Sequence, residues 1–192
     1  MSQQELLKRV VQALSCAGVE YMLTGSFASS LQGEPRSSHD IDLVVDIQAD
    51  TIDKIVESFP PPRFHLSKDH VAEAVTKRDM FNIIDSDTGN KVNFWLLTDT
   101  PFDRMRFSRR RSEEVLGIKI AVSAPEDTIL AKLRWAKLSG GSKKQFTDAL
   151  RVYEVQFDNL DIAYLQDWAK KIGVEDLLEE IEAAAETIGD GA

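Results

Sequence analysis

The chain alternates between two kinds of apolar pattern, which predict a mixture of helices and strands. Apolar residues spaced three to four apart, as from Leu6 to Leu14, predict an amphipathic helix that Ser2 caps and Gly18 ends. Short apolar runs bounded by turn residues predict strands instead. These runs lie at residues 19–24, 41–45, 80–85, 91–97 and 117–122. We therefore predict an α+β (mixed α/β) fold in which a small mixed sheet is flanked by helices.

The C-terminal third of the chain carries helical patterns only. Pro125 and the two acids that follow it, Glu126 and Asp127, are typical of the first turn of a helix. Asp161 is a capping residue for a further helix, and a last helical pattern covers residues 174–188. We predict two parts, an α/β core at residues 1–123 and a helical region at residues 124–192 packed on it.

The composition is typical of a globular protein. The chain has 192 residues, of which 43% are hydrophobic and 29% charged. No apolar run approaches the ~20 residues that a membrane span needs, and no secretory signal pattern opens the chain, so we expect a cytoplasmic protein with no membrane partner. The single cysteine, Cys16, lies among apolar neighbours in the first predicted helix, where we expect a buried thiol.

Positive charge is concentrated in the middle of an acidic chain. The net charge is −9, yet residues 101–151 hold 12 Lys and Arg against 6 Asp and Glu. Much of this charge comes from arginines at positions 104, 106, 109, 110 and 111. Such a group can contact a triphosphate or a nucleic-acid backbone. The alternative is a solvated arginine face that pairs with Glu113, Glu114 and the acidic tail, and the sequence leaves both hypotheses open.

Two carboxylates, Asp40 and Asp42, open the apolar run at residues 41–45. Because side chains in a strand alternate between faces, both point the same way, roughly 6–7 Å apart for two rises of about 3.3 Å. Like charges this close repel unless a cation lies between them, and carboxylate oxygens suit hard divalent ions. This pair is therefore a candidate Mg²⁺ site.

A glycine and a serine, Gly25 and Ser26, end an apolar strand and open a short helix of small residues. Backbone N–H groups at a helix start have no partner within the helix and can hold an anion such as a phosphate. Glycine allows a close approach to the backbone, and the Ser26 hydroxyl adds a donor. We expect these two residues to bind nucleotide phosphates.

The run from Gly25-Ser26 through Gly33-Glu34-Pro35-Arg36 to Asp40-Ile41-Asp42 resembles the polymerase-β-type nucleotidyltransferase superfamily. Within it, the chain is most similar to bacterial minimal nucleotidyltransferases and to AbiEii-type toxins of toxin–antitoxin pairs. The resemblance implies transfer of a nucleotidyl group from a nucleoside triphosphate to a hydroxyl, with one or two Mg²⁺ ions at the carboxylates.

The same resemblance extends to further site residues and to partners. It implies that Arg36 and Lys132 lie near the nucleotide phosphates and that Asp148 borders the nucleotide site. The implied acceptors include a tRNA end or a protein hydroxyl, and the toxin branch implies an antitoxin as partner. An acceptor such as a small-molecule antibiotic stays open.

Asn93 stands where the resembled family has a third carboxylate. In the family this acid helps to bind metal and to deprotonate the attacking hydroxyl. An asparagine can offer a neutral carbonyl oxygen to a metal, but it cannot act as a base. The alternative function is therefore a catalytically degenerate nucleotide-binding or protein-interaction module with the same fold.

Overall fold

The computed structural model describes residues 1–38, 40–115 and 117–189 of the chain, which forms two compact units. The first unit consists of Met1–Thr24 and Ser38–Val122. The second consists of Gly25–Ser37 and Ser123–Ala192. The segment Gly25–Ser37 thus belongs with the C-terminal helices, although the division predicted from the sequence runs once, between residues 123 and 124.

The first unit is built on one mixed sheet. Within the described ranges the sheet has six strands in the order β3-β4-β2-β1-β6-β5. The strands are β1 (Tyr21–Thr24), β2 (Asp40–Val45), β3 (Met80–Ile84), β4 (Lys91–Leu96), β5 (Arg111–Val115) and β6 (Ile118–Val122). The pairs β2–β4 and β1–β6 are parallel, and the other neighbours are antiparallel. This architecture confirms the predicted α+β class.

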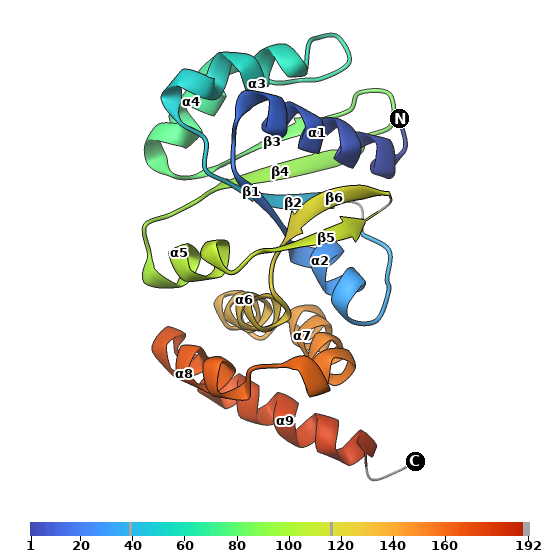
Figure 1. The fold of residues 1–192 in the computed structure, drawn as a ribbon, viewed down its shortest axis with the longest axis vertical. Helices are drawn as coiled ribbons and strands as arrows, with labels where there is room; N and C mark the ends of the chain where they lie inside the picture. The colour runs from blue at the N-terminus through green and yellow to red at the C-terminus, as the bar shows by residue number, and fades with distance from the viewer. Residues whose placement is uncertain (39, 116, 190–192) are drawn as a thin grey trace. The chain divides into compact units, whose positions relative to one another are not determined.

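In the described part of the first unit, four helices accompany this sheet. They are α1 (Gln3–Ala17), α3 (Ile52–Ser58), which a 3₁₀ turn (Ala49–Thr51) precedes, α4 (Lys68–Lys77) and α5 (Pro101–Ser108). Helices α1, α3 and α4 gather on one side of β3 and β4 (Figure 1). Helix α1 begins with a capping box between Ser2 and Glu5 and ends at Gly18 in the left-handed conformation, as its sequence predicts.

Strand β2 shows the alternation on which the candidate site depends. Ile41 and Leu43 are completely buried, whereas Asp40 and Asp42 are partly exposed. An apolar core therefore takes one face of the strand, and both carboxylates project from the other face.

Two expectations from the sequence are wrong in this unit. Residues 111–115 form β5, which is not among the strands that the apolar runs predicted. Strand β5 is mostly polar and becomes a strand through its antiparallel pairing with β6. Cys16 is exposed rather than buried, because it lies on the outer face of α1 beside Ser15.

The second unit is helical. Its helices are α2 (Gly25–Gln32), α6 (Pro125–Leu138), α7 (Lys143–Gln156), α8 (Ile162–Ile172) and α9 (Glu175–Gly189), with a 3₁₀ turn at Phe157–Asn159. Helix α2 packs against both α6 and α7, and α8 and α9 pack against α6 and α7 respectively. The start of α6 at Pro125 and the Asp161 cap of α8 agree with the sequence patterns.

Gly33 allows the end of α2 to touch the backbone of α7. A Cβ atom at this position would lie 2.8 Å from the Val152 nitrogen and 2.9 Å from the Arg151 carbonyl carbon. Contacts this short with backbone atoms force a shift of one of the two segments. Any side chain at position 33 therefore separates α2 from α7.

We predict that Gly33→Ala lowers the free energy of unfolding by about 1–3 kcal/mol through this overpacking. Urea unfolding followed by circular dichroism measures the effect. Leu31→Ala, at an exposed position of α2, is the matched control and should change stability by no more than about 0.5 kcal/mol. Equal stability of Gly33→Ala and the wild type would show that the contact is not required.

Candidate functional site

An acidic group lies on one face of the sheet in the first unit. Because β2 and β4 pair in parallel, Asp40 lies opposite Lys91 and Asp42 opposite Asn93. The Asn93 side-chain Nδ2 donates a hydrogen bond of 2.9 Å to Asp42 Oδ1. The Lys91 ammonium forms an ion pair of 3.1 Å with Asp40 Oδ2. Both carboxylates therefore face neighbours on β4.

Trp95 is a member of this group that the sequence analysis missed. Its indole Nε1 lies 3.4 Å from Asp42 Oδ1, where it donates a second hydrogen bond to the same oxygen. Trp95 stands two residues after Asn93 on β4, and the period-two rule places both side chains on one face. The two-residue spacing between Asn93 and Trp95 could therefore have predicted from the sequence that Trp95 belongs to this group.

The acidic group suits a divalent cation. Among the described residues, no cluster of three or more His, Cys, Asp or Glu side chains forms a metal cage. Mg²⁺, however, is commonly held by one or two carboxylates together with waters and substrate phosphates. A second observation fits: Asn93 is 6% exposed, and its Oδ1 atom is buried without a hydrogen-bond partner in the described part of the chain. Asp40 and Asp42 are thus the residues that could hold the ion, and Asn93 lies beside them.

A basic group forms in the second unit around Asp148 on α7. The Arg36 guanidinium donates to both oxygens of this carboxylate, from Nε at 2.7 Å and from Nη2 at 2.6 Å. The Lys132 ammonium, on α6, donates to Asp148 Oδ2 at 2.7 Å. Ser26 Oγ accepts from Arg36 Nη2 at 2.7 Å and from Lys132 Nζ at 3.4 Å. Four of the residues predicted to contact nucleotide therefore form one cluster.

The charges of this cluster are strongly coupled. Burial raises the pKa of the Asp148 carboxyl, but the hydrogen bonds from Arg36 and Lys132 outweigh burial, and the net pKa is lower than usual. The hydrogen bond to Asp148 in turn raises the pKa of Arg36. Two cations share one anion, so the cluster keeps a positive charge that can attract a phosphate.

Gly25 begins α2 with φ of 67°, in the left-handed region that glycine adopts at little cost. Ser26 follows in the first turn of this helix, where its hydroxyl joins the basic group. The sequence placed a phosphate-binding turn at these two residues, and that role stays a prediction. The structure adds that Ser26 accepts hydrogen bonds from two cationic side chains.

Three of the arginines at residues 104–111 pair with acids of their own unit. Arg106 binds Asp103 at 2.9 Å, and Arg110 binds Glu20 at 2.6 Å. Arg104 forms an ion pair with Asp99. These contacts support the hypothesis of a surface arginine face, although the partners differ from Glu113, Glu114 and the acidic tail.

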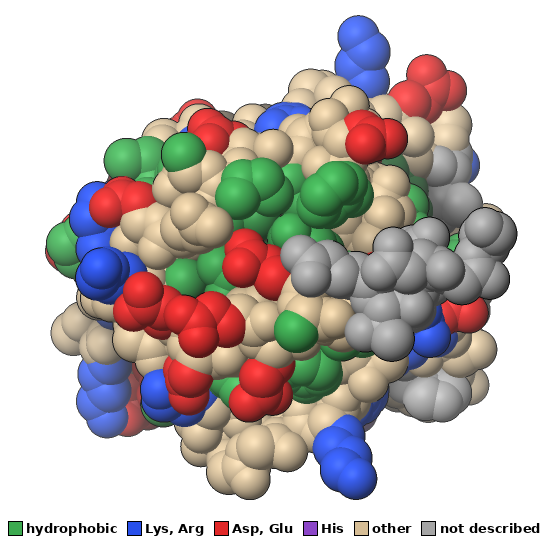
Figure 2. All heavy atoms as spheres, turned by 90° about the horizontal axis from the view of Figure 1, so that it is seen from below, with side chains coloured by type: hydrophobic (Ala, Val, Ile, Leu, Met, Phe, Trp, Pro, Cys, Tyr) green, Lys and Arg blue, Asp and Glu red, His purple; other side chains and the backbone are tan. Residues whose placement is uncertain are grey.

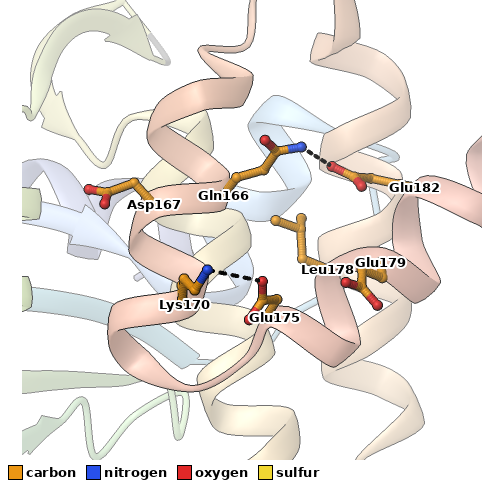
Figure 3. A pocket seen from close by; sticks show the side chains of 7 residues that line it. All are labelled: Gln166, Asp167, Lys170, Glu175, Leu178, Glu179 and Glu182. Carbon is orange, nitrogen blue, oxygen red and sulfur yellow. Dashed lines mark hydrogen bonds and ion pairs between the residues drawn. The ribbon is translucent and has the colours of Figure 1, made fainter.

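A separate hollow of about 420 Å³ lies between α8 and α9 of the second unit. Figure 2, a view turned by 90° from that of Figure 1, shows acidic side chains gathered beside apolar ones. The hollow is lined by Gln166, Asp167, Lys170, Glu175, Leu178, Glu179 and Glu182 (Figure 3). Four carboxylates and one ammonium would repel a triphosphate, and none of the predicted site residues lies here.

The predicted site residues thus form two groups, one in each unit. Asp40, Asp42 and Asn93 come together on β2 and β4. The members of the second group are Gly25, Ser26, Arg36, Lys132 and Asp148, of which the last four are joined by hydrogen bonds. Among the described residues, no helix has both the length and the apolar character needed to cross a membrane.

One family model and several solved structures are similar to this chain. The family model for aminoglycoside-2''-adenylyltransferase matches residues 6–91. The solution structure of the antibiotic-resistance factor ANT(2'')-Ia is 12% identical and covers 98% of this chain and 97% of that one, with a TM-score of 0.50. The chain has the nucleotidyltransferase fold.

Two further solved structures are similar. A crystal structure of ANT(2'')-Ia in complex with adenylyl-2''-tobramycin is 11% identical and covers 97% of this chain and 98% of that one, with a TM-score of 0.48. An antigenic nucleotidyltransferase-like protein from Paracoccidioides brasiliensis is 16% identical and covers 91% and 90%, with a TM-score of 0.46. No curated protein matches the chain in sequence.

We predict that Asp148→Asn lowers the free energy of unfolding at pH 7 by about 3–5 kcal/mol, because Lys132, which is 4% exposed, loses its buried counter-charge. The lowered pKa of Asp148 means that its stabilising effect is present above the unfolded value of about 3.9 and is lost as the pH falls through the folded value. The difference between variant and wild type should therefore shrink from pH 7 to pH 3.

Urea unfolding at both pH values measures this effect. Asp176→Asn is the matched control, because Asp176 pairs with Lys137 at 3.2 Å while both side chains remain more than half exposed. It should change stability far less than Asp148→Asn does, because an exposed ion pair contributes little. A loss for Asp148→Asn as small as that of the control would contradict a tightly coupled buried cluster.

Proposed function

We propose that the chain is a Mg²⁺-dependent nucleotidyltransferase, which transfers a nucleoside monophosphate group from a nucleoside triphosphate to a hydroxyl acceptor. The observation that carries the proposal is the pair Asp40 and Asp42 on one face of β2, in a protein of nucleotidyltransferase fold. The basic group of Ser26, Arg36 and Lys132 supports it, since a triphosphate needs charge neutralisation as well as a metal site.

In the proposed reaction, the acceptor oxygen forms a bond to the α-phosphorus while the bond from that phosphorus to the bridging oxygen breaks. Pyrophosphate leaves, and the acceptor hydroxyl loses its proton. A divalent ion bound at Asp40 and Asp42 would polarise the phosphate oxygens and offset developing charge. Asn93 cannot accept this proton. Among the described residues of the acidic group, Asp40 and Asp42 are the side chains that can act as the base.

The acceptor that we propose to test first is an aminoglycoside, with ATP as donor. The family model over residues 6–91 supports this pair, since its name specifies adenylyl transfer to an aminoglycoside 2'' position. A tRNA end and a protein hydroxyl stay as further predicted acceptors. The toxin hypothesis, with its antitoxin partner, also stays a prediction from sequence resemblance.

We predict that ATP binding requires Mg²⁺ and that Asp42→Asn and Lys132→Met each weaken it at least ~10-fold and lower turnover ~100-fold or more. Calorimetric titration of the four nucleoside triphosphates, with and without Mg²⁺, measures binding, and release of pyrophosphate measures turnover. Lys137→Met is the control on the same helix, because Lys137 is exposed and pairs with Asp176.

Binding that is equal in all three variants would count against the proposed site. If the chain binds triphosphate but shows no turnover with aminoglycosides, tRNA or protein, the proposed reaction is wrong, whereas the fold assignment is unaffected.

One observation favours a second candidate function, a nucleotide-binding module without turnover. Position 93 holds an amide where the resembled superfamily has an acid, and that amide is hydrogen-bonded to Asp42. If this candidate is right, we predict that Asn93→Asp creates or raises pyrophosphate release from a wild type with little or none. No gain over several donors and acceptors would count against it.

A further inference from the structure

Both printed hydrogen bonds to Asp42 reach the same carboxylate oxygen. Asn93 Nδ2 donates to Asp42 Oδ1 at 2.9 Å and Trp95 Nε1 approaches it to 3.4 Å. Neither of these two bonds involves the second oxygen, Oδ2. These two contacts therefore hold Asp42 by a single oxygen, Oδ1.

Trp95 is held in place by its packing. Its ring lies against a buried apolar cluster of Met22, Val44, Leu97 and Phe107. A ring fixed in this way directs its N–H group with little loss of side-chain entropy on binding. The hydrogen bond of Trp95 can therefore orient the Asp42 carboxylate.

Asn93 presents its amide nitrogen, not its carbonyl oxygen, to Asp42. In this arrangement it acts as a donor to a carboxylate and cannot share a cation with the oxygen that it contacts. An aspartate at the same position would place a second negative group near 2.9 Å from Asp42 Oδ1. Two carboxylates at that separation repel each other unless a cation or a proton joins them.

We propose that Asn93 and Trp95 are positioning residues that hold Asp42 by Oδ1, so that the acidic group takes one divalent cation through Asp42 Oδ2 and Asp40. This inference rests on the proposed function and specifies its metal requirement. Asn93 occupies, with a neutral donor, the place where a third carboxylate would support a second ion. Asp40 Oδ2 is likewise paired with Lys91, which leaves one oxygen of each aspartate for the cation.

Equilibrium binding of Mn²⁺ alone to the full chain, followed by electron paramagnetic resonance of the free ion, tests the proposal. The wild type should bind one Mn²⁺ per chain, and Asp42→Asn should abolish that binding. Asn93→Asp should bind two, since the new carboxylate adds a ligand where the amide donor was. Each result is a stoichiometry, which a purely structural role of residue 93 would not change.

Trp95→Phe keeps an aromatic ring and removes only the N–H donor. It should bind one Mn²⁺ about 10-fold more weakly than the wild type, because the loss of an outer hydrogen bond to a ligand typically costs 10–100-fold in metal affinity. Trp135→Phe, an exposed tryptophan on α6, is the matched control and should bind Mn²⁺ as the wild type does. The metal-free melting temperature of each variant separates a change in binding from a change in folding.

Four results would each overturn the proposal: two Mn²⁺ ions on the wild type, no ion on the wild type, a single ion on Asn93→Asp, or wild-type affinity in Trp95→Phe. Failure here is distinguishable from failure of the proposed function. A wild type that binds two ions and transfers nucleotides refutes the inference alone. One that binds a single ion and transfers none refutes the function alone.

Discussion

The parallel pairing of β2 with β4 is the constraint on which the acidic group depends. This register sets Asp42 beside Asn93 and Asp40 beside Lys91. A slip of one residue would turn every side chain of β2 to the opposite face and bring Ile41 and Leu43 out of the core. Burial of these two residues is complete, so the apolar core and the polar group determine the same register. The chemistry of the group is thus a consequence of how the core packs.

A second constraint operates in the helical unit, where Asp148 holds two cations. Arg36 comes from the loop after α2, and Lys132 from α6, so the carboxylate on α7 joins three segments that are distant in sequence. Burying any one of these charges alone would be costly, and only their mutual hydrogen bonds make the arrangement stable. The same bonds set the direction in which both side chains point. A group that can attract phosphate is therefore also part of the structure of its unit.

The nucleotidyltransferase fold supports the proposed chemistry. This chain departs from the resembled family in the residues that surround Asp42. Asn93 contributes a donor in place of a base, and Trp95 adds a second donor to the same oxygen. Arg104, Arg106 and Arg110 pair with acids of the first unit, which favours a surface arginine face over nucleic-acid contact for these three residues. The proposed function thus depends on few residues, on two strands and three helical segments.

The sequence by itself determined the α+β class, the helix caps at Ser2 and Asp161, and the shared direction of Asp40 and Asp42, because capping and strand alternation are local properties. Only the tertiary structure decided that residues 111–115 form a strand, since a polar edge strand exists through its partner β6. It also decided which way Cys16 faces and which atom of Asn93 meets Asp42. These features depend on contacts between residues far apart in the chain, which no local pattern encodes.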